Sequence, residues 1–233
     1  RPPRATLFPY TTLFRSFYSP EAARVSYGLG IQHICFSDSP HATAVMKLVI
    51  PLVQKLLIPW IIPKKEFTKF GVNAKDIIHY RAIDAAVITK RKISKNSKKP
   101  SKKVKRKIIL VRVEEEQASY SSKKRPAFPI IKEIIKNFHN EEIVVTGRYS
   151  SQVKHLAQTF GNKIKILDKV VDGKTLLNNV DVFIGSGGTM TAESALLGIP
   201  TISYNAIPNI IETYLVRKKL VLRKTSPKQI TVS

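Results

Sequence analysis

The sequence has little cysteine, few acidic residues and no long apolar run. Its single cysteine, Cys35, excludes a framework of internal disulfides and any cysteine-rich zinc module. Histidine and acidic residues form no cluster with metal-ligand spacing, so the sequence predicts no metal site. The 16 acidic residues face 40 lysines and arginines in 233 residues, which gives a formal net charge of +24. Such an excess raises the question of a nucleic-acid partner.

The most apolar stretch, residues 48–63, is interrupted by Lys55 and by three prolines. A membrane-spanning helix needs about 20 consecutive apolar residues. The first residues also lack the basic, apolar and small-residue order of a secretory signal. The sequence therefore predicts a cytoplasmic protein with no transmembrane segment.

The positive charge is concentrated in residues 90–107, which hold eleven basic side chains and no acidic one. Repulsion among these lysines keeps such a stretch extended and solvated, so we interpret residues 85–106 as a basic linker or loop. Phosphates of a nucleic acid are an alternative ligand for this run, although it has no aromatic residue for base stacking. An anionic membrane surface is another alternative, at about 1 kcal/mol per nearby basic residue.

The first sixteen residues, RPPRATLFPYTTLFRS, resemble a translated sequencing adapter. On this interpretation residues 1–16 are a non-native leader that lies outside the fold, and the native sequence starts in the middle of a domain. An ordinary native arm is the alternative.

Residues 17–84 alternate between helical and strand patterns. Apolar runs of strand length occupy residues 31–36, 55–58 and 77–80, and helical patterns occupy residues 20–29, 44–54 and 64–70.

Residues 107–233 repeat this alternation. Strands are predicted at 107–113, 142–146, 163–167, 180–184, 200–204 and 219–222, and helices at 128–138, 150–160, 173–179, 189–197 and 209–216. This order specifies right-handed crossovers and a parallel sheet covered on both faces, which predicts a Rossmann-like α/β domain. A new helix starts at Ser226-Pro227, so we expect the domain to be cut at its C-terminal end.

The most informative segment is DVFIGSGGTMTAESALLGIP, residues 181–200. A buried strand leads into Gly185, Ser186, Gly187 and Gly188, and a helix opens at Thr189. Glycines let a ligand approach the backbone, and the unpaired N–H groups of a first helical turn attract a phosphate or diphosphate. A tight turn with no ligand is the alternative. The segment matches neither a Walker loop nor the dinucleotide fingerprint.

Glu193 follows Thr189 by one helical turn. Side chains on a helix lean toward its N-terminus, so this carboxylate is placed to accept hydrogen bonds from a vicinal diol such as ribose. Alternatively it only complements the helix dipole, an effect of about 0.3–1 kcal/mol.

Other polar residues follow predicted strands. Arg112 and Arg148 are each placed to neutralise a diphosphate, or to form surface salt bridges. Asp38 and His41 follow the strand at 31–36 and are candidates for a catalytic base and its orienting partner, or for a turn before Pro40 with an exposed histidine. Residues 114–116, three glutamates, are predicted to form a solvated turn.

The stretch SGGTMTAESALLGIPTISY resembles the donor-site segment of GT-B glycosyltransferases and of UDP-N-acetylglucosamine 2-epimerase. In those families a Ser-Gly-Gly run binds the nucleotide diphosphate and a glutamate on the next helix binds ribose. Residues 17–233 are similar to the domain-of-unknown-function family 354 (DUF354), through SPEAARVSYGLGIQHICFSDSPHATAV, LIPWIIPKKEFTKFGV, VRVEEEQASY and IGSGGTMTAESALLGIP.

The resemblance implies a GT-B-like α/β fold with two Rossmann-like domains that face a cleft. Residues 17–84 would be the later part of a truncated N-terminal domain, and residues 107–233 the C-terminal nucleotide-binding domain. An acidic residue near Asp38 belongs to the catalytic cleft in the epimerase-like relatives.

The expected function is that of a nucleotide-sugar-dependent glycosyltransferase, with a UDP-sugar as substrate and no tightly bound cofactor. The acceptor is unknown; a lipid-linked or anionic acceptor at the membrane surface is a further hypothesis. A sugar-nucleotide epimerase is the alternative enzyme, disfavoured because VRVEEE lacks the histidine that the 2-epimerases carry after the corresponding strand. A basic nucleic-acid-binding protein acting through residues 90–107 is the alternative outside enzymes.

Overall fold

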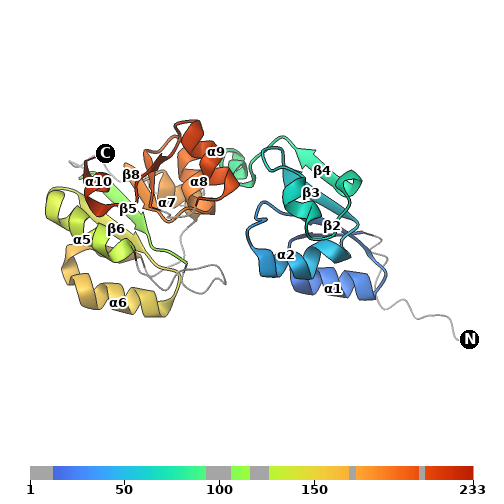
Figure 1. Cartoon of the computed structure of the whole chain (residues 1–233). Coiled ribbons are helices and arrows are strands. Elements are labelled where there is room, and N and C mark those ends of the chain that lie inside the picture. Colours follow the sequence, from blue (N-terminus) through green and yellow to red (C-terminus); the bar gives the residue numbers. More distant parts are fainter. Residues whose placement is uncertain (1–12, 93–105, 116–125, 168–171, 205–207, 233) are drawn as a thin grey trace, which may run out of the picture. The chain divides into compact units, whose positions relative to one another are not determined.

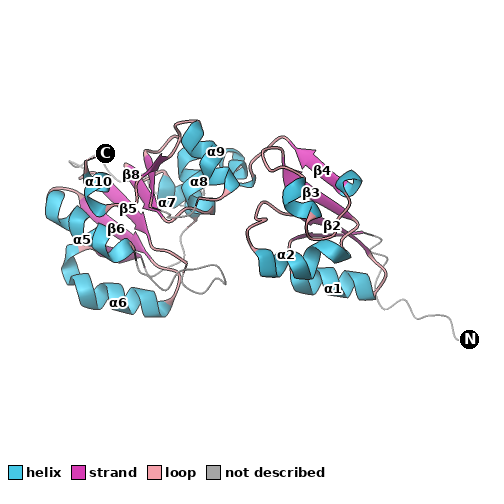
Figure 2. Ribbon diagram, viewed as in Figure 1, coloured by secondary structure: helices cyan, strands magenta, loops and turns pink. Residues whose placement is uncertain are grey.

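The computed structural model describes residues 13–92, 106–115, 126–167, 172–204 and 208–232. The chain divides into two units, residues 1–84 and residues 85–233. Each unit is built on its own parallel sheet flanked by helices (Figures 1 and 2). The structure therefore has the α/β class that the alternating sequence pattern predicted.

The sheet of the first unit contains four parallel strands in the order β1-β2-β3-β4. The strands are β1 (Leu13–Phe17), β2 (Gln32–Phe36), β3 (Lys55–Pro59) and β4 (Ile77–Tyr80). The crossovers contain α1 (Pro20–Gly28), α2 (Thr43–Val49) with η1 (Ile50–Leu52), and α3 (Lys65–Thr68) with η2 (Ala74–Asp76). Right-handed crossovers between strands in sequential order all fall on one face of a sheet, and Figure 1 shows α1 and α2 on the same side.

The structure differs from the sequence-based expectation for the leader. Strand β1 pairs with β2 over its whole length, from Leu13 opposite Gln32 to Phe17 opposite Phe36. Ser16 Oγ also lies 2.8 Å from Nε2 of the buried His33. The interpretation of residues 1–16 as a non-native leader left them out of the fold; residues 13–16 form part of the sheet, while residues 1–12 are outside the described part of the chain.

The start of the predicted linker is also folded. Residues Asp84–Ala86 form η3 and Val87–Lys90 form α4. The Ile88 side chain is fully buried in a cluster with Leu110 and Phe183 of the second unit. This burial corrects the linker boundary for residues 85–90, and residues 93–105 of the basic run are outside the described residues.

The sheet of the second unit has the strand order β10-β9-β8-β5-β6-β7, with all pairs parallel. The strands are β5 (Ile108–Arg112), β6 (Glu142–Thr146), β7 (Lys165–Leu167), β8 (Val182–Gly185), β9 (Thr201–Ser203) and β10 (Leu222–Arg223). This is the classic Rossmann order, in which the chain moves outward from β5 in one direction and then returns to continue from β8 in the other. Ligands of such sheets bind at the carboxyl ends of the two strands where the direction reverses.

Helices cover both faces of this second sheet (Figure 2). They are α5 (Ala127–Asn137), α6 (Ser150–Phe160) with η4 (Gly161–Lys163), α7 (Gly173–Leu177), α8 (Thr189–Leu196), α9 (Ile210–Arg217) and α10 (Pro227–Thr231). Because successive strand side chains point to opposite faces, Ile109 and Val111 pack with α5 and α6, whereas Leu110 packs with Phe183 and α7. The last strand lies at Leu222–Arg223 rather than at the predicted 219–222.

Close packing at the end of β8 leads to a stability prediction. A β-carbon on Gly185 would lie 2.6 Å from Phe183 Cε1 and 2.8 Å from Thr191 Oγ1. Phe183 is fully buried and cannot move aside without disturbing the core. Gly185→Ala should therefore lower the free energy of unfolding by about 1–3 kcal/mol, measured by thermal or denaturant unfolding.

The matched control is Gly28→Ala at the end of α1, where the added β-carbon would meet no atom within 4 Å. This change should leave stability unaltered or raise it slightly. Equal stability of the two variants would contradict the packing argument.

Candidate functional site

The turn between β8 and α8 lies where the strand order reverses, next to the end of β5. Gly187 and Gly188 both have positive φ, at 83° and 80°, and ψ of Gly188 is −166°. This conformation is open essentially to glycine alone. The two glycines therefore let the chain leave the strand and enter the helix in one short turn.

The amides of this turn are available to a ligand. Ala192 N is the first helical donor, bonded to Gly188 O at 3.2 Å. Within the described residues, no acceptor is found for the backbone N–H groups of residues 186–191. A β-carbon on Gly188 would also meet nothing within 4 Å, so the space beside these amides is open. Together with the helix dipole, this arrangement is suited to an anion.

Glu193 lies one turn into α8, half-buried, and leans toward the start of α7. Its Oε2 is 3.8 Å from where a β-carbon on Gly173 would lie. Burial raises the pKa of Glu193; the positive charge of Arg91 lowers it, and Asp172 raises it again. The carboxylate makes no hydrogen bond within the described residues, which leaves its oxygens free to accept bonds from a ligand.

Two arginines lie at the carboxyl ends of β5 and β6, the strands that follow β8 in the sheet order. Arg112 ends β5 and donates from Nη1 to Thr146 Oγ1 at 3.3 Å, while its Nε is buried with no partner in the described residues. Arg148 follows β6 and forms an ion pair with Glu115 Oε2 at 2.8 Å. Burial and the neighbouring charge of Arg148 lower the pKa of Arg112. An added anion would relieve the repulsion between the two guanidinium groups.

Tyr204 and Glu114 support this edge of the sheet, and sequence reasoning assigned neither a role there. The hydroxyl of Tyr204 donates to Arg112 O at 2.8 Å and lies 3.1 Å from Glu114 Oε2. Burial and the charge of Glu114 raise the pKa of Tyr204, whereas a hydrogen bond with the Ser186 side chain lowers it. The prediction of a solvated turn at residues 114–116 is wrong for Glu114, which is 8% exposed. Tyr204 and Glu114 are ninety residues apart in the sequence, and only the fold brings them together.

The candidate catalytic residues of the first unit follow β2. Asp38 accepts a hydrogen bond from Ser39 Oγ at 2.7 Å. Partial desolvation lowers the pKa of His41, and the charge of Asp38 raises it. Sequence reasoning missed a neighbouring pair, Tyr80 at the end of β4 and Asp84, whose side chains are hydrogen-bonded to each other. Burial is the main cause that raises the pKa of Asp84, and the charge of Asp38 raises it further.

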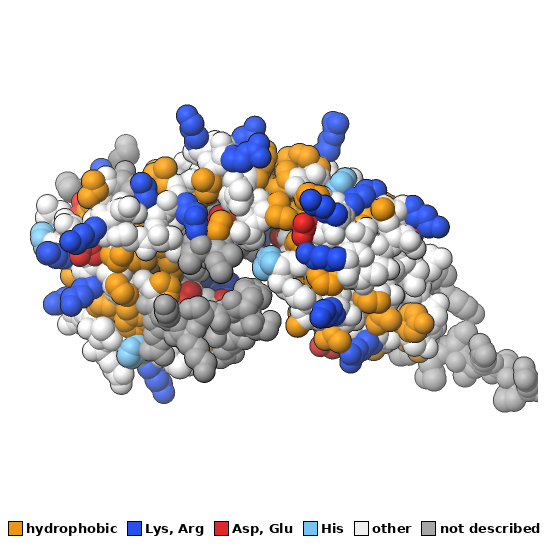
Figure 3. Space-filling view, in the orientation of Figure 1, with side chains coloured by type: hydrophobic (Ala, Val, Ile, Leu, Met, Phe, Trp, Pro, Cys, Tyr) orange, Lys and Arg blue, Asp and Glu red, His pale blue; other side chains and the backbone are white. Residues whose placement is uncertain are grey.

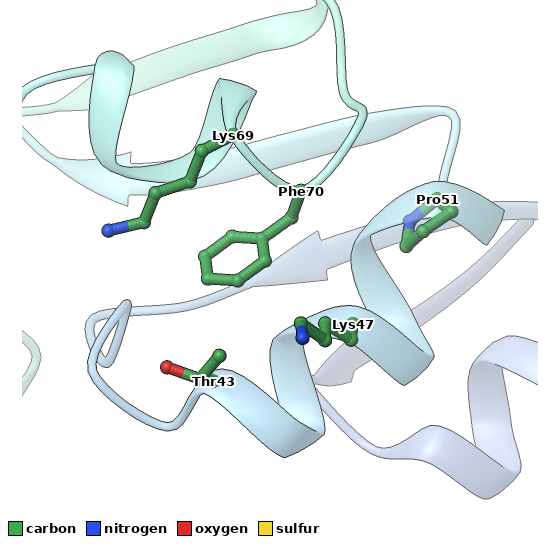
Figure 4. A pocket seen from close by; sticks show the side chains of 5 residues that line it. All are labelled: Thr43, Lys47, Pro51, Lys69 and Phe70. Carbon is green, nitrogen blue, oxygen red and sulfur yellow. The ribbon is translucent and has the colours of Figure 1, made fainter.

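A separate pocket of about 480 Å³ lies on the helical face of the first unit (Figure 4). It is lined by Thr43, Lys47, Pro51, Lys69 and Phe70. Figure 4 shows Phe70 between Lys69 on one side and the α2 residues on the other. None of the residues predicted from the sequence to act in catalysis or binding lines this pocket.

The described residues contain no helix long and apolar enough to cross a membrane. In the same residues, no group of three histidine, cysteine or acidic side chains is placed to hold a metal ion. Figure 3 shows lysine and arginine side chains scattered among other residues on the visible face of each unit. The hypothesis of a nucleic-acid site at residues 90–107 falls largely on residues outside the described ranges.

Known structures share this architecture. UDP-GlcNAc 2-epimerase from Neisseria meningitidis, solved with UDP-GlcNAc, is 14% identical with a TM-score of 0.72 over 94% of this chain and 65% of its own. The Methanocaldococcus jannaschii enzyme, in complex with UDP-GlcNAc and UDP, is 14% identical with a TM-score of 0.67 over 94% and 66%. Anabaena Alr3699/HepE in complex with UDP is 12% identical with a TM-score of 0.56 over 94% and 66%. The chain therefore has a GT-B-type α/β fold.

The chain is shorter than a relative that it matches in sequence. The uncharacterized protein MJ0665 of Methanocaldococcus jannaschii is 28% identical over 230 residues, which cover 91% of this chain and 63% of the relative. The chain thus spans less than two thirds of that protein. The model of a family described as "Protein of unknown function (DUF354)" matches residues 12–233, and the chain belongs to this family.

Proposed function

We propose that the second unit binds a UDP-sugar and that the protein transfers the sugar to an acceptor. The observation that carries the proposal is the row of amides at residues 186–191, which have no acceptor among the described residues and lie at the reversal point of a Rossmann-type sheet. The diphosphate would lie on these amides, the ribose hydroxyls on Glu193, and the remaining charge against Arg148 and Arg112.

The comparisons support the choice of nucleotide. Solved structures with this fold include complexes with UDP-GlcNAc and with UDP. Their identity to this chain is low, so the base and the sugar rest on the likeness of fold together with the site.

The geometry suits the departure of a diphosphate. In glycosyl transfer, the bond between the anomeric carbon and the diphosphate oxygen breaks, the acceptor oxygen bonds to that carbon, and the acceptor proton passes to a base. Negative charge grows on the diphosphate as it leaves, and preorganised amides and the α8 dipole stabilise that charge. For this base we propose His41, with Asp38 as its orienting partner, because a histidine whose pKa is lowered is neutral near pH 7 and accepts a proton.

Epimerisation of a UDP-sugar is the second candidate. Several solved structures with this fold are UDP-GlcNAc 2-epimerases. The two activities separate by product analysis: transfer releases UDP only when an acceptor is present, whereas epimerisation inverts C2 of the sugar and introduces deuterium there in heavy water.

The first test is a calorimetric titration of UDP into the full chain. Arg148→Gln should weaken binding by about tenfold or more, since a hydrogen bond between charged groups contributes about 1.5–3 kcal/mol. Arg217→Gln is the matched control, because Arg217 is exposed in the last turn of α9, away from the β8–α8 turn. Absence of UDP binding, or equal losses in the two variants, would contradict the proposal.

A further inference from the structure

A buried lysine fixes the backbone at the end of α4. Lys174 is 9% exposed, and its Nζ donates to Thr89 O at 2.9 Å and to Arg91 O at 2.6 Å. These carbonyls lie at the C-terminal end of a helix, where acceptors are left without helical partners and a positive charge is favourable. A buried ammonium is tolerated only when it is hydrogen-bonded. Through these two hydrogen bonds, Lys174 holds the backbone of Arg91 against α7.

The side chain of Arg91 is 54% exposed and forms an ion pair with Asp172. Asp172 caps α7 through Oδ1, which accepts from Thr175 N at 3.0 Å and from Thr175 Oγ1 at 3.1 Å. Its Oδ2 accepts from Arg91 Nη2 at 3.0 Å. The bond from Thr175 N is the main cause of the lowered pKa of Asp172, so the carboxyl stays ionised. Arg91 is thus held at its backbone by Lys174 and at its guanidinium group by Asp172.

Glu193 lies beside this pair. Gly173, which its carboxylate approaches, directly follows Asp172. Arg91 and Asp172 are the charged groups that act on Glu193, with opposite signs. Without Arg91, two carboxylates would remain close together in a half-buried site, and the charged form of Glu193 would be disfavoured.

We propose that Arg91 is a positioning residue that acts through Glu193, because its positive charge keeps that carboxylate ionised beside the ribose hydroxyls of the nucleotide. The inference rests on the proposed function and deepens it: the segment 87–91, at the start of the basic run, becomes part of the nucleotide site. Arg91 acts here through Glu193, and the recognised group is the vicinal diol of a ribonucleotide.

The test compares two ligands that differ by one hydroxyl, UDP and 2′-deoxyuridine diphosphate, on the full chain. The unmodified protein should prefer UDP by about tenfold, the effect of one hydrogen bond to a charged group. In Glu193→Gln the preference should fall to about twofold or less, with a smaller loss of affinity for the deoxy ligand. In Arg91→Gln the preference should be lost at an acidic pH at which the unmodified protein still shows it. Lys90→Gln removes a neighbouring exposed charge and should keep the full preference.

The pH dependence gives a second measurement that misfolding would not imitate. The preference for UDP should disappear as the pH falls through the pKa of Glu193, because the protonated carboxyl is the weaker acceptor. Arg91→Gln removes the positive charge and should move this midpoint to higher pH. Asp172→Asn keeps an N-cap residue but removes a negative charge, and should move the midpoint to lower pH.

The outcomes separate the two proposals. A protein that binds neither ligand overturns the proposed function. If UDP binds and Glu193→Gln loses the preference, but Arg91→Gln keeps it down to the same pH as the unmodified protein, the role of Arg91 is overturned. Midpoints that move in the same direction in Arg91→Gln and Asp172→Asn also overturn it.

Discussion

Gly188→Ala is expected to weaken the binding of UDP by about 10- to 100-fold. The backbone at this position has φ of 80° and ψ of −166°, a region that costs a residue with a β-carbon about 1–3 kcal/mol. The new methyl group would also enter the open space beside the unpaired amides. Turn and ligand are therefore both disturbed, and calorimetric titration of UDP measures the result.

The same helix supplies a matched control. Gly198 follows the C-terminal end of α8, has φ of 79°, and likewise has no atom within 4 Å of an added β-carbon. Gly198→Ala should lower the melting temperature, as Gly188→Ala does, because both place a β-carbon at positive φ. Only Gly188→Ala should lose UDP affinity; similar losses in both variants would show that the amides of this turn do not bind the diphosphate.

Glu193→Gln is expected to weaken UDP binding by about 10- to 100-fold near neutral pH. The substitution keeps the size of the side chain but replaces a charged acceptor, whose hydrogen bonds each contribute about 1.5–3 kcal/mol. Because burial raises the pKa of Glu193, the wild-type affinity should already decline at a pH above that at which an ordinary glutamate is protonated. The affinity of the glutamine variant should not show this decline, because glutamine does not titrate.

Glu141→Gln is the control for this change. Glu141 precedes β6 and so lies at the amino edge of the same sheet, opposite the ends of β5 and β8. Its substitution removes an equal charge and should leave UDP affinity and its pH dependence unchanged. A wild-type affinity with no pH dependence down to the titration range of ordinary carboxylates would contradict the role of Glu193.

Strands and helices of the second unit were predictable because their signals are local. The apolar runs at 142–146 and 180–184 correspond to β6 (Glu142–Thr146) and β8 (Val182–Gly185). The glycines at 187 and 188 marked the turn before α8, since few other residues adopt that backbone conformation. Periodicity and glycine placement are properties of neighbouring residues, so no tertiary contact was needed to find them.

Errors arose where distant contacts decide the structure. Four residues, 87–90, form a helix within a lysine-rich context because Ile88 is buried against Leu110 and Phe183. Glu114 is buried because Tyr204, ninety residues away, bonds to it. Strand β1 depends on pairing with β2. No sequence window contains both partners of these contacts.

The sequence by itself determined the α/β class, the strand–glycine–helix turn at residues 184–189 and the placement of Glu193 one turn later. Only the tertiary structure decided that β5, which ends at Arg112, lies next to β8, that Arg148 is close to Arg112, and that Arg91 and Asp172 are close to Glu193. Backbone conformation and hydrophobic periodicity follow from neighbours along the chain. The electrostatic environment of a carboxylate instead depends on which remote segments the fold packs against it.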